Sequence, residues 1–181
     1  MNADSLNVQD QVACILERIR KLESDVSPKG RIHAELYDKE GNLKWEGDAD
    51  NSVTNQGKNS WLGIMFHNDT QIAAWYIGIM DNSGWTAEAA TDTLASHSGW
   101  NEFTNYSGNR QAWGPSASSG QSITNGTPVQ FTMTGSGTLK GILVASVASG
   151  TSGTLWSTAD FGSTVPVNSG DVLKVSYTVN S

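Results

Sequence analysis

Cysteine and histidine, the side chains most used for metal binding and covalent catalysis, are scarce in this sequence. Its 181 residues include one cysteine, Cys14, and three histidines. A single cysteine leaves no intrachain disulfide, so we expect assembly in a reducing cytoplasm. His33, His67 and His97 lie far apart, and none has a second histidine at the spacing of metal ligands. We therefore predict no metal site and no cysteine nucleophile.

Long apolar stretches and basic clusters are also missing. The longest apolar stretch, "IAAWYIGIM", is much shorter than a membrane-spanning helix. The opening stretch "MNADSLNVQD" lacks the basic start and the apolar core of a signal peptide. The formal net charge is −7, and no run of Lys and Arg opposes it. We expect no membrane partner, no signal peptide and no nucleic-acid partner.

The sequence contains no recognisable catalytic motif. Glu88 and Asp92 could lie on one helix face as a carboxylate pair, but a solvated face is the simpler expectation. "GSGTLKG" has the spacing of neither glycine-rich phosphate loop, and "GPSASSG" is not a nucleophile elbow. We predict a protein that is not an enzyme and that carries no cofactor.

What is present begins with a periodic N-terminal stretch, "VQDQVACILERIRKLESDVSPKG". Its apolar residues alternate spacings of four and three, which is the seam of a coiled coil. Arg18 at a g position and Glu23 at the following e position are placed for an interchain ion pair. Ser27 and Pro28 end the predicted helix. The seam consists of Val8, Val12, Ile15, Ile19, Leu22 and Val26.

This seam predicts an oligomerisation stalk over residues 1–28. Isoleucine at neighbouring a and d positions favours a trimer over a dimer, so we expect a homotrimer. The alternative is a single amphipathic helix packed on its own domain, and Leu16 at an e position widens the stripe in that direction. Because three heptads are marginal alone, the rest of the chain must help to hold the oligomer together.

The density of charged side chains falls after residue 50, which divides the chain that follows the stalk into two parts. Residues 1–50 hold eighteen charged side chains, whereas residues 51–181 hold eleven. Residues 29–50 alternate apolar and polar side chains around "DKEGN", which predicts a collar hairpin that turns near Gly41. Residues 51–181 form the predicted β-rich globular domain.

The globular domain is expected to be mainly β, with one or two short helices. "TNQGKNSWLGIMF" predicts a helix capped by Thr54 or Asn55, and "TAEAATDTLASH" predicts a helical turn or two. Residues 71–81 are almost continuously apolar, as in a strand buried on both faces. The later short strands are separated by turn-forming stretches, which predicts an antiparallel β-sandwich or jelly roll. These strands are expected near residues 110–113, 129–134, 139–147, 155–158 and 172–179.

Tryptophan is the one candidate for a binding site. Trp45, Trp61 and Trp75 lie in predicted elements and are expected in the core or an interface. A second set lies in or beside loops rich in Asn, Ser and Gly, where an aromatic ring could stack on a sugar. The alternative, which we expect, is that these rings pack the long loops onto the core. This set consists of Trp85, Trp100, Tyr106 and Trp113.

Several stretches resemble a family of small virion structural proteins of tailed bacteriophages. They are "VTNQGKN", "WYIGIMDNSG", "ASHSGWNEF" and "GTLWSTADF", and the similarity extends from residue 53 to about residue 180. Members of this family are described as capsid decoration, head-fibre or tail-fibre-like proteins. No active site is attached to the family.

The resemblance implies a place in a virion assembled in the cytoplasm of a bacterial host, with the major capsid protein among the partners. The stalk favours a trimeric capsid decoration or head-fibre protein that projects from the particle by ~28 Å, at ~1.5 Å for each of ~19 helical residues. Three linked subunits would also gain avidity. The alternative is a tail-fibre or spike adhesin that binds a glycan of the host surface.

Overall fold

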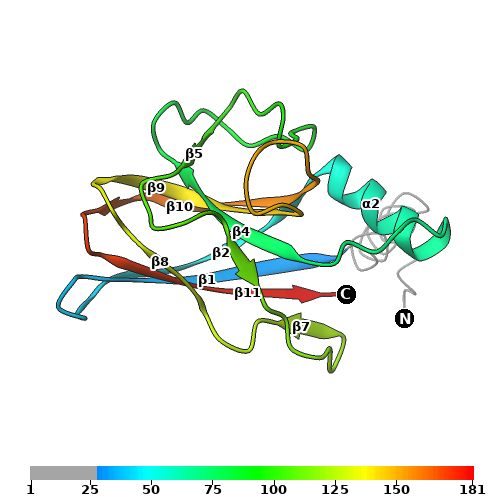
Figure 1. Ribbon diagram of the computed structural model, residues 1–181, viewed down its shortest axis with the longest axis horizontal. Coiled ribbons are helices and arrows are strands. Elements are labelled where there is room, and N and C mark those ends of the chain that lie inside the picture. Colours follow the sequence, from blue (N-terminus) through cyan, green and yellow to red (C-terminus); the bar gives the residue numbers. More distant parts are fainter. Residues whose placement is uncertain (1–27) are drawn as a thin grey trace, which may run out of the picture.

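The computed structural model describes residues 28–181. The predicted coiled-coil seam lies outside these residues and stays a prediction. The described part is mainly β and its sheets are antiparallel, as the sequence predicts. Figure 1 shows two sheets stacked face to face, with one helix projecting at the end where the C-terminus lies.

Sheet A has three long strands in the order β2, β1 and β11, with two short strands on the far edge of β11. β7 pairs with the last residues of β11, and β8 pairs with its first residues. The strands are β1 (Lys29–Tyr37), β2 (Leu43–Asp50), β7 (Ser122–Thr124), β8 (Val129–Thr132) and β11 (Val172–Asn180).

Sheet B has the order β3, β10, β9, β4 and β5, and β6 also pairs with β4. The long strands β10, β9 and β4 form its centre. The strands are β3 (Ser52–Val53), β4 (Trp75–Asp81), β5 (Asn101–Phe103), β6 (Gln111–Trp113), β9 (Gly137–Ala145) and β10 (Leu155–Val167).

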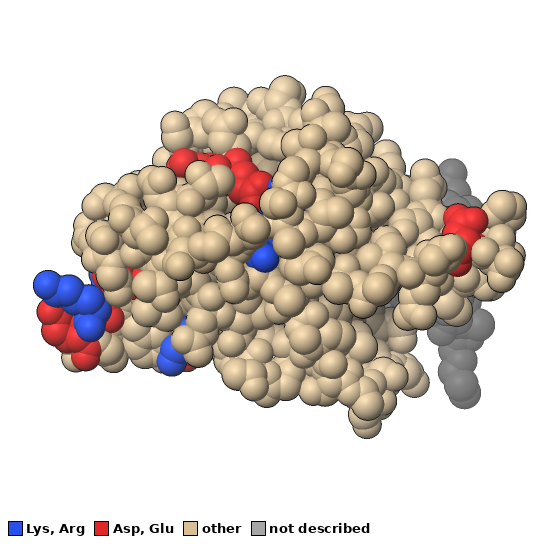
Figure 2. Space-filling view, viewed as in Figure 1, with Lys and Arg blue, Asp and Glu red and all other residues tan. Residues whose placement is uncertain are grey.

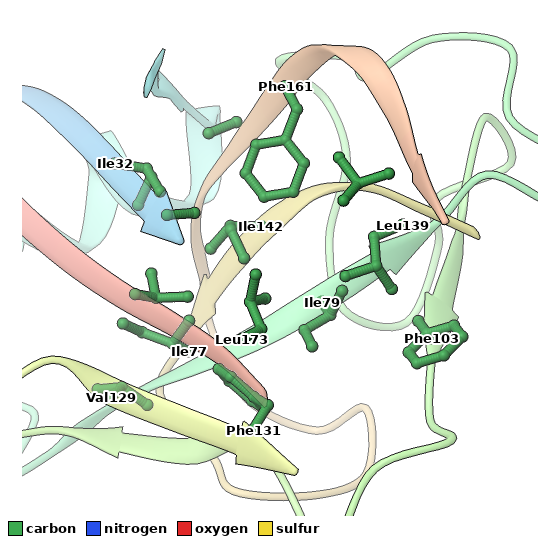
Figure 3. Packing of buried hydrophobic residues seen from close by; sticks show 14 of the residues in the cluster. Ile32, Ile77, Ile79, Phe103, Val129, Phe131, Leu139, Ile142, Phe161 and Leu173 are labelled. Carbon is green, nitrogen blue, oxygen red and sulfur yellow. The ribbon is translucent and has the colours of Figure 1, made fainter. Parts of the chain in front are cut away.

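The main core lies between the two sheets. Alternation places Ile32, Ala34 and Leu36 of β1 on its inner face, whereas the intervening side chains point outward. Figure 3 shows Ile32 and Leu173 of sheet A close to Ile142 of sheet B, among side chains contributed by both sheets. The two layers therefore share one apolar interior, which is the packing of a β-sandwich.

The hairpin of residues 29–50 belongs to this sandwich. β1 pairs with β11 along its whole length, from Lys29 opposite Asn180 to Tyr37 opposite Val172. β2 lies at the edge of sheet A, and the turn contains Gly41 at a φ of 87°, a conformation that glycine adopts without strain. The hairpin predicted as a separate collar is thus part of the sheet, because its apolar face is needed to close the core.

The apolar run of residues 71–81, predicted as a strand buried on both faces, contains β4. Ile77 and Ile79 point into the main core, while Met80 packs in a second apolar cluster on the other face of sheet B. The neighbouring β9 divides in the same way, with Ile142 inside and Leu143 outside. Apolar side chains on both faces require a second covering layer on sheet B.

That covering layer is the segment of residues 82–100, in which the sequence predicts a helical turn or two over residues 86–97. The structure has turns there and no helix. Thr86 N donates to Gly99 O at 2.8 Å, so the two ends of the segment lie side by side. The prediction was wrong because burial of Leu94 and Trp100 against sheet B, rather than local helix propensity, determines the backbone.

Candidate functional site

Helix α2 (Asn55–Phe66) forms the most unusual surface of the described part. Thr54 is its N-cap, as predicted, and its Oγ1 accepts a hydrogen bond from Gly57 N at 3.0 Å. The same hydroxyl donates to Leu155 O at 2.5 Å. One buried side chain therefore begins the helix and joins it to β10.

The first turn of α2 lies directly on sheet B. Gly57 is buried, and a Cβ atom at this position would come within 2.4 Å of Trp156 O. Only glycine allows this approach. The last turns of the helix extend beyond the sheet, as Figure 1 shows. The helix is therefore held at its start and uncovered near its end.

The uncovered part carries large apolar side chains. Leu62 is 46% exposed, Met65 59% and Phe66 77%. These are three of the four exposed large hydrophobic residues in the described part, and the fourth, Leu43, lies on β2 beside the turn of the hairpin. The helical spacing of "TNQGKNSWLGIMF" predicts Trp61, Leu62, Met65 and Phe66 on one side of the helix. It did not reveal that no layer of the described chain covers them.

A pocket of about 220 Å³ lies beside this face, between α2 and the end of the sandwich. Its walls come from α2, from the loop after it, and from strands of both sheets. Five aromatic rings and several aliphatic side chains make it strongly apolar. The lining residues are Ser60, Trp61, Ile64, Met65, Gln71, Ile72, Trp75, Trp113, Ile123, Val144, Trp156, Tyr177 and Val179.

Three aromatic residues of the pocket, Trp113, Trp156 and Tyr177, form hydrogen bonds within the protein. Tyr177 Oη accepts from Trp156 Nε1 and from Asn51 Nδ2, each at 2.8 Å. Trp113 Nε1 donates to Tyr177 O at 3.2 Å. Burial raises the pKa of Tyr177 to about 12, so its phenol stays protonated at neutral pH.

This arrangement suits apolar contact rather than chemistry. The phenol of Tyr177 cannot act as a base near neutral pH, and the pocket lining contains no Cys, His, Asp or Glu. A sugar site needs several polar groups directed at the ligand, whereas the indoles of Trp113 and Trp156 already donate within the protein. The pocket and the α2 face together form a surface suited to apolar contact.

The chain enters the described structure next to this surface. Gly30 of β1 pairs with Val179 of β11, and Val179 lines the pocket. Figure 1 shows the first residues of β1 and the C-terminus at the same end as α2. The segment predicted as a stalk is thus joined to the domain beside the exposed apolar face.

The four aromatic residues predicted as a possible glycan site do not form one platform. Trp100 is 2% exposed and packs in the outer cluster of sheet B, where the ring of His97 stacks on it at 3.8 Å between centroids. Trp85 is half-buried on the same cluster, and Lys140 Nζ lies 5.1 Å from the centre of its ring. Both rings pack the 82–100 segment onto the sheet.

The other two rings lie in the main core on the opposite face of sheet B. Trp113 is 8% exposed and Tyr106 is 6% exposed. Tyr106 meets Phe131 edge to face, and burial raises the pKa of its phenol. The expectation that the loop tryptophans are buried is confirmed for Trp100 and Trp113. Trp61 and Trp75 were expected in the core or an interface and Trp156 was not singled out, and no local signal indicated that the three line one pocket.

Asp92 differs from its expected solvated position. It is 7% exposed, and its Oδ2 accepts from Trp100 Nε1 and from Ala89 N, each at 2.9 Å. Trp100 thereby has its indole donor satisfied below the surface. Asp92 acts as an anchor of the 82–100 segment.

A smaller, polar cavity of about 170 Å³ surrounds Arg110. The guanidinium donates from Nε and Nη2 to the two oxygens of Glu102, at 2.9 and 2.7 Å. Its Nη1 donates to Val147 O and Gly150 O, both at 3.1 Å. These bonds attach the β9–β10 loop to β5, so the arginine has a structural role.

Residues 28–181 contain no group of three or more His, Cys, Asp and Glu side chains placed to hold a metal ion. Within the same residues, no helix has the length and hydropathy needed to span a membrane. No protein-family model matches the chain, and a search of curated proteins found no match.

Proposed function

We propose that this chain is a structural protein of a bacteriophage virion. It assembles as a trimer through residues 1–28 and projects from the particle as a capsid decoration or head-fibre protein. The proposal includes the trimeric coiled coil, whose residues lie outside the described part, and a jelly-roll-like course of the chain. The resemblance of residues 53 to about 180 to virion proteins is its starting point.

The observation that supports it best is the apolar surface beside the chain entry. An exposed apolar patch next to an apolar pocket is typical of an interaction site. Its place next to Gly30 is where a stalk would bring several subunits together. The sandwich has its own core between sheets A and B, as a domain carried on a stalk requires.

The surface composition is consistent with this role. Figure 2 shows broad uncharged areas, with the charged groups confined to a few clusters. The alternative role as a glycan-binding adhesin has no supporting geometry in the described residues. Trp100, Tyr106 and Trp113 are buried, and Lys140 lies over the ring of Trp85.

The decisive experiment is to locate the protein on purified particles of the phage that encodes it, by cryo-electron microscopy. We expect density that projects from the capsid, with three copies at each occupied site. Density confined to the tail tip would favour the adhesin instead. Particles that lack the protein altogether would contradict the proposal.

The trimer can be tested separately with the full chain. Replacing Ile15 and Ile19 with Asn would bury two polar groups per chain without matched partners, at about 1–3 kcal/mol each. We expect three chains by sedimentation for the intact protein, and dissociation of the double variant on dilution. Cys14→Ser, at an outward heptad position, is the matched control and should leave assembly unchanged. A monomeric intact protein at micromolar concentration would contradict the stalk.

A further inference from the structure

The apolar surface at the α2 end has two parts that lie side by side. One is a ridge formed by Leu62 and Phe66, which protrude from the helix into solvent and do not line the pocket. The other is the pocket itself, with Trp61, Trp75 and Trp156 among its aromatic lining residues. Met65 belongs to both. The ridge and the pocket are both apolar, and one protrudes where the other is recessed.

The position of the chain entry indicates what covers this surface. Copies joined through residues 1–28 are tethered directly before β1, and the first residues of β1 lie beside Val179 of the pocket. A short tether raises the effective concentration of neighbouring domains to the millimolar range, so a modest contact area suffices. Three heptads alone are marginal, so additional contacts between the domains are needed.

We propose that the ridge of α2 in one copy packs into the aromatic pocket of the next copy, which closes a three-fold ring at the base of the domains. A three-fold contact is heterologous, since each patch meets a different patch on its neighbour. The ridge and the pocket are such a pair, at the end where the copies are joined. This inference rests on the trimer of the proposed function and assigns its second interface.

The chemistry of the surface favours a second copy over a soluble ligand. The pocket offers few polar groups to orient a small molecule, and its indoles at Trp113 and Trp156 donate internally. A ring of three copies would cover Leu62, Met65 and Phe66 in every chain at once. No other exposed apolar group of this size occurs in the described residues, because Leu43 stands alone on β2.

The test uses the full chain with Phe66→Asp and, as its matched control, Leu43→Asp. Both side chains are exposed, at 77% and 49%, so neither change disturbs the core, which circular dichroism would verify. Sedimentation over a dilution series measures the concentration at which half of the trimer dissociates. We expect Phe66→Asp to raise this concentration at least about tenfold and Leu43→Asp to change it less than about twofold.

The outcomes distinguish a failure of the inference from a failure of the proposed function. A trimer that dissociates equally for the intact chain and for Phe66→Asp would overturn the inference and leave the trimer standing. The inference would also fail if Phe66→Asp formed normal trimers that no longer bound the phage particle, because the face would then contact another virion protein. A monomeric intact chain would refute the inference together with the trimer. Selective weakening by Phe66→Asp supports both.

Discussion

The outer face of sheet B and the exposed face of α2 both carry large apolar side chains outside the main core, but residues 28–181 cover only the first. Segment 82–100 folds over Leu143 and Met80 and buries Leu94 and Trp100 there. No described segment covers Phe66 in the same way.

The difference lies in the polar anchors available to the covering segment. Asp92 accepts from Trp100 Nε1 and Ala89 N, and Thr86 N donates to Gly99 O, so the segment has satisfied polar groups where it becomes buried. The loop after α2 has exposed residues from Asn68 to Gln71. The α2 face therefore stays exposed in the described part of the chain.

The largest expected effect is on the covered face. Trp100→Ala would remove a large buried ring and leave a cavity between the 82–100 segment and sheet B, which we expect to lower the free energy of unfolding by about 3–5 kcal/mol. Phe66→Ala should change it by less than about 0.5 kcal/mol, measured at a dilution where the chains are separate. Chemical denaturation of both variants makes the comparison. Equal losses would mean that the two faces do not differ as described.

The next largest loss of stability is expected for the hydrogen bonds to Tyr177 Oη. Tyr177→Phe would leave Trp156 Nε1 and Asn51 Nδ2 without their acceptor, which we expect to cost about 1–3 kcal/mol of folding free energy. Thermal or chemical unfolding at pH 7 measures this loss. Replacing Lys58, exposed on α2, with Ala provides the surface control.

The same variant tests the pKa of Tyr177. Because the folded-state pKa is about 12 and the unfolded value is about 10, the folded state holds the proton more tightly. The contribution of this pKa difference to the free energy of unfolding is complete below about pH 10 and is lost as the pH rises toward 12. We therefore expect the difference between the intact protein and Tyr177→Phe to narrow over this range. Parallel stability curves between pH 9 and pH 12 would contradict the assignment.

The smallest effect is expected at the start of α2. Thr54→Ala would remove the N-cap acceptor of Gly57 N and the donor to Leu155 O, at a cost of about 0.5–2 kcal/mol. Thr54→Ser keeps the hydroxyl and should recover most of the loss. Hydrogen exchange of the α2 amides is the direct measurement, since a loosened start would expose them. Unchanged exchange in Thr54→Ala would mean that packing alone holds the helix.

Sequence periodicity predicted an element correctly where the spacing of its apolar residues agrees with the faces that are buried in the structure. The alternation around Ile32 and Leu36 predicted the hairpin, though not its place in sheet A, and the apolar run ending at Asp81 predicted a strand buried on both sides. Thr54 was predicted as a cap because a threonine before a helix accepts from the first turn. These features depend on residues close together in the sequence.

Predictions were weaker where distant parts of the chain meet. The helical turn expected in "TAEAATDTLASH" was replaced by turns, because Trp100 and Asp92 hold that segment on sheet B. The pocket combines α2 with strands from both sheets, so no short pattern could show that Trp75, Trp156 and Tyr177 share a surface.

The sequence by itself determined the mainly β character, the hairpin, the capped helix and the absence of a recognisable catalytic motif, since each depends on local periodicity or composition. Only the tertiary structure decided which apolar residues are covered. Burial depends on contacts between distant segments, and the large apolar side chains of Trp100 and Phe66 are 2% and 77% exposed respectively. Because Trp100 and Trp113 are buried and Phe66 is exposed, the candidate site is the surface beside α2 rather than the loop tryptophans.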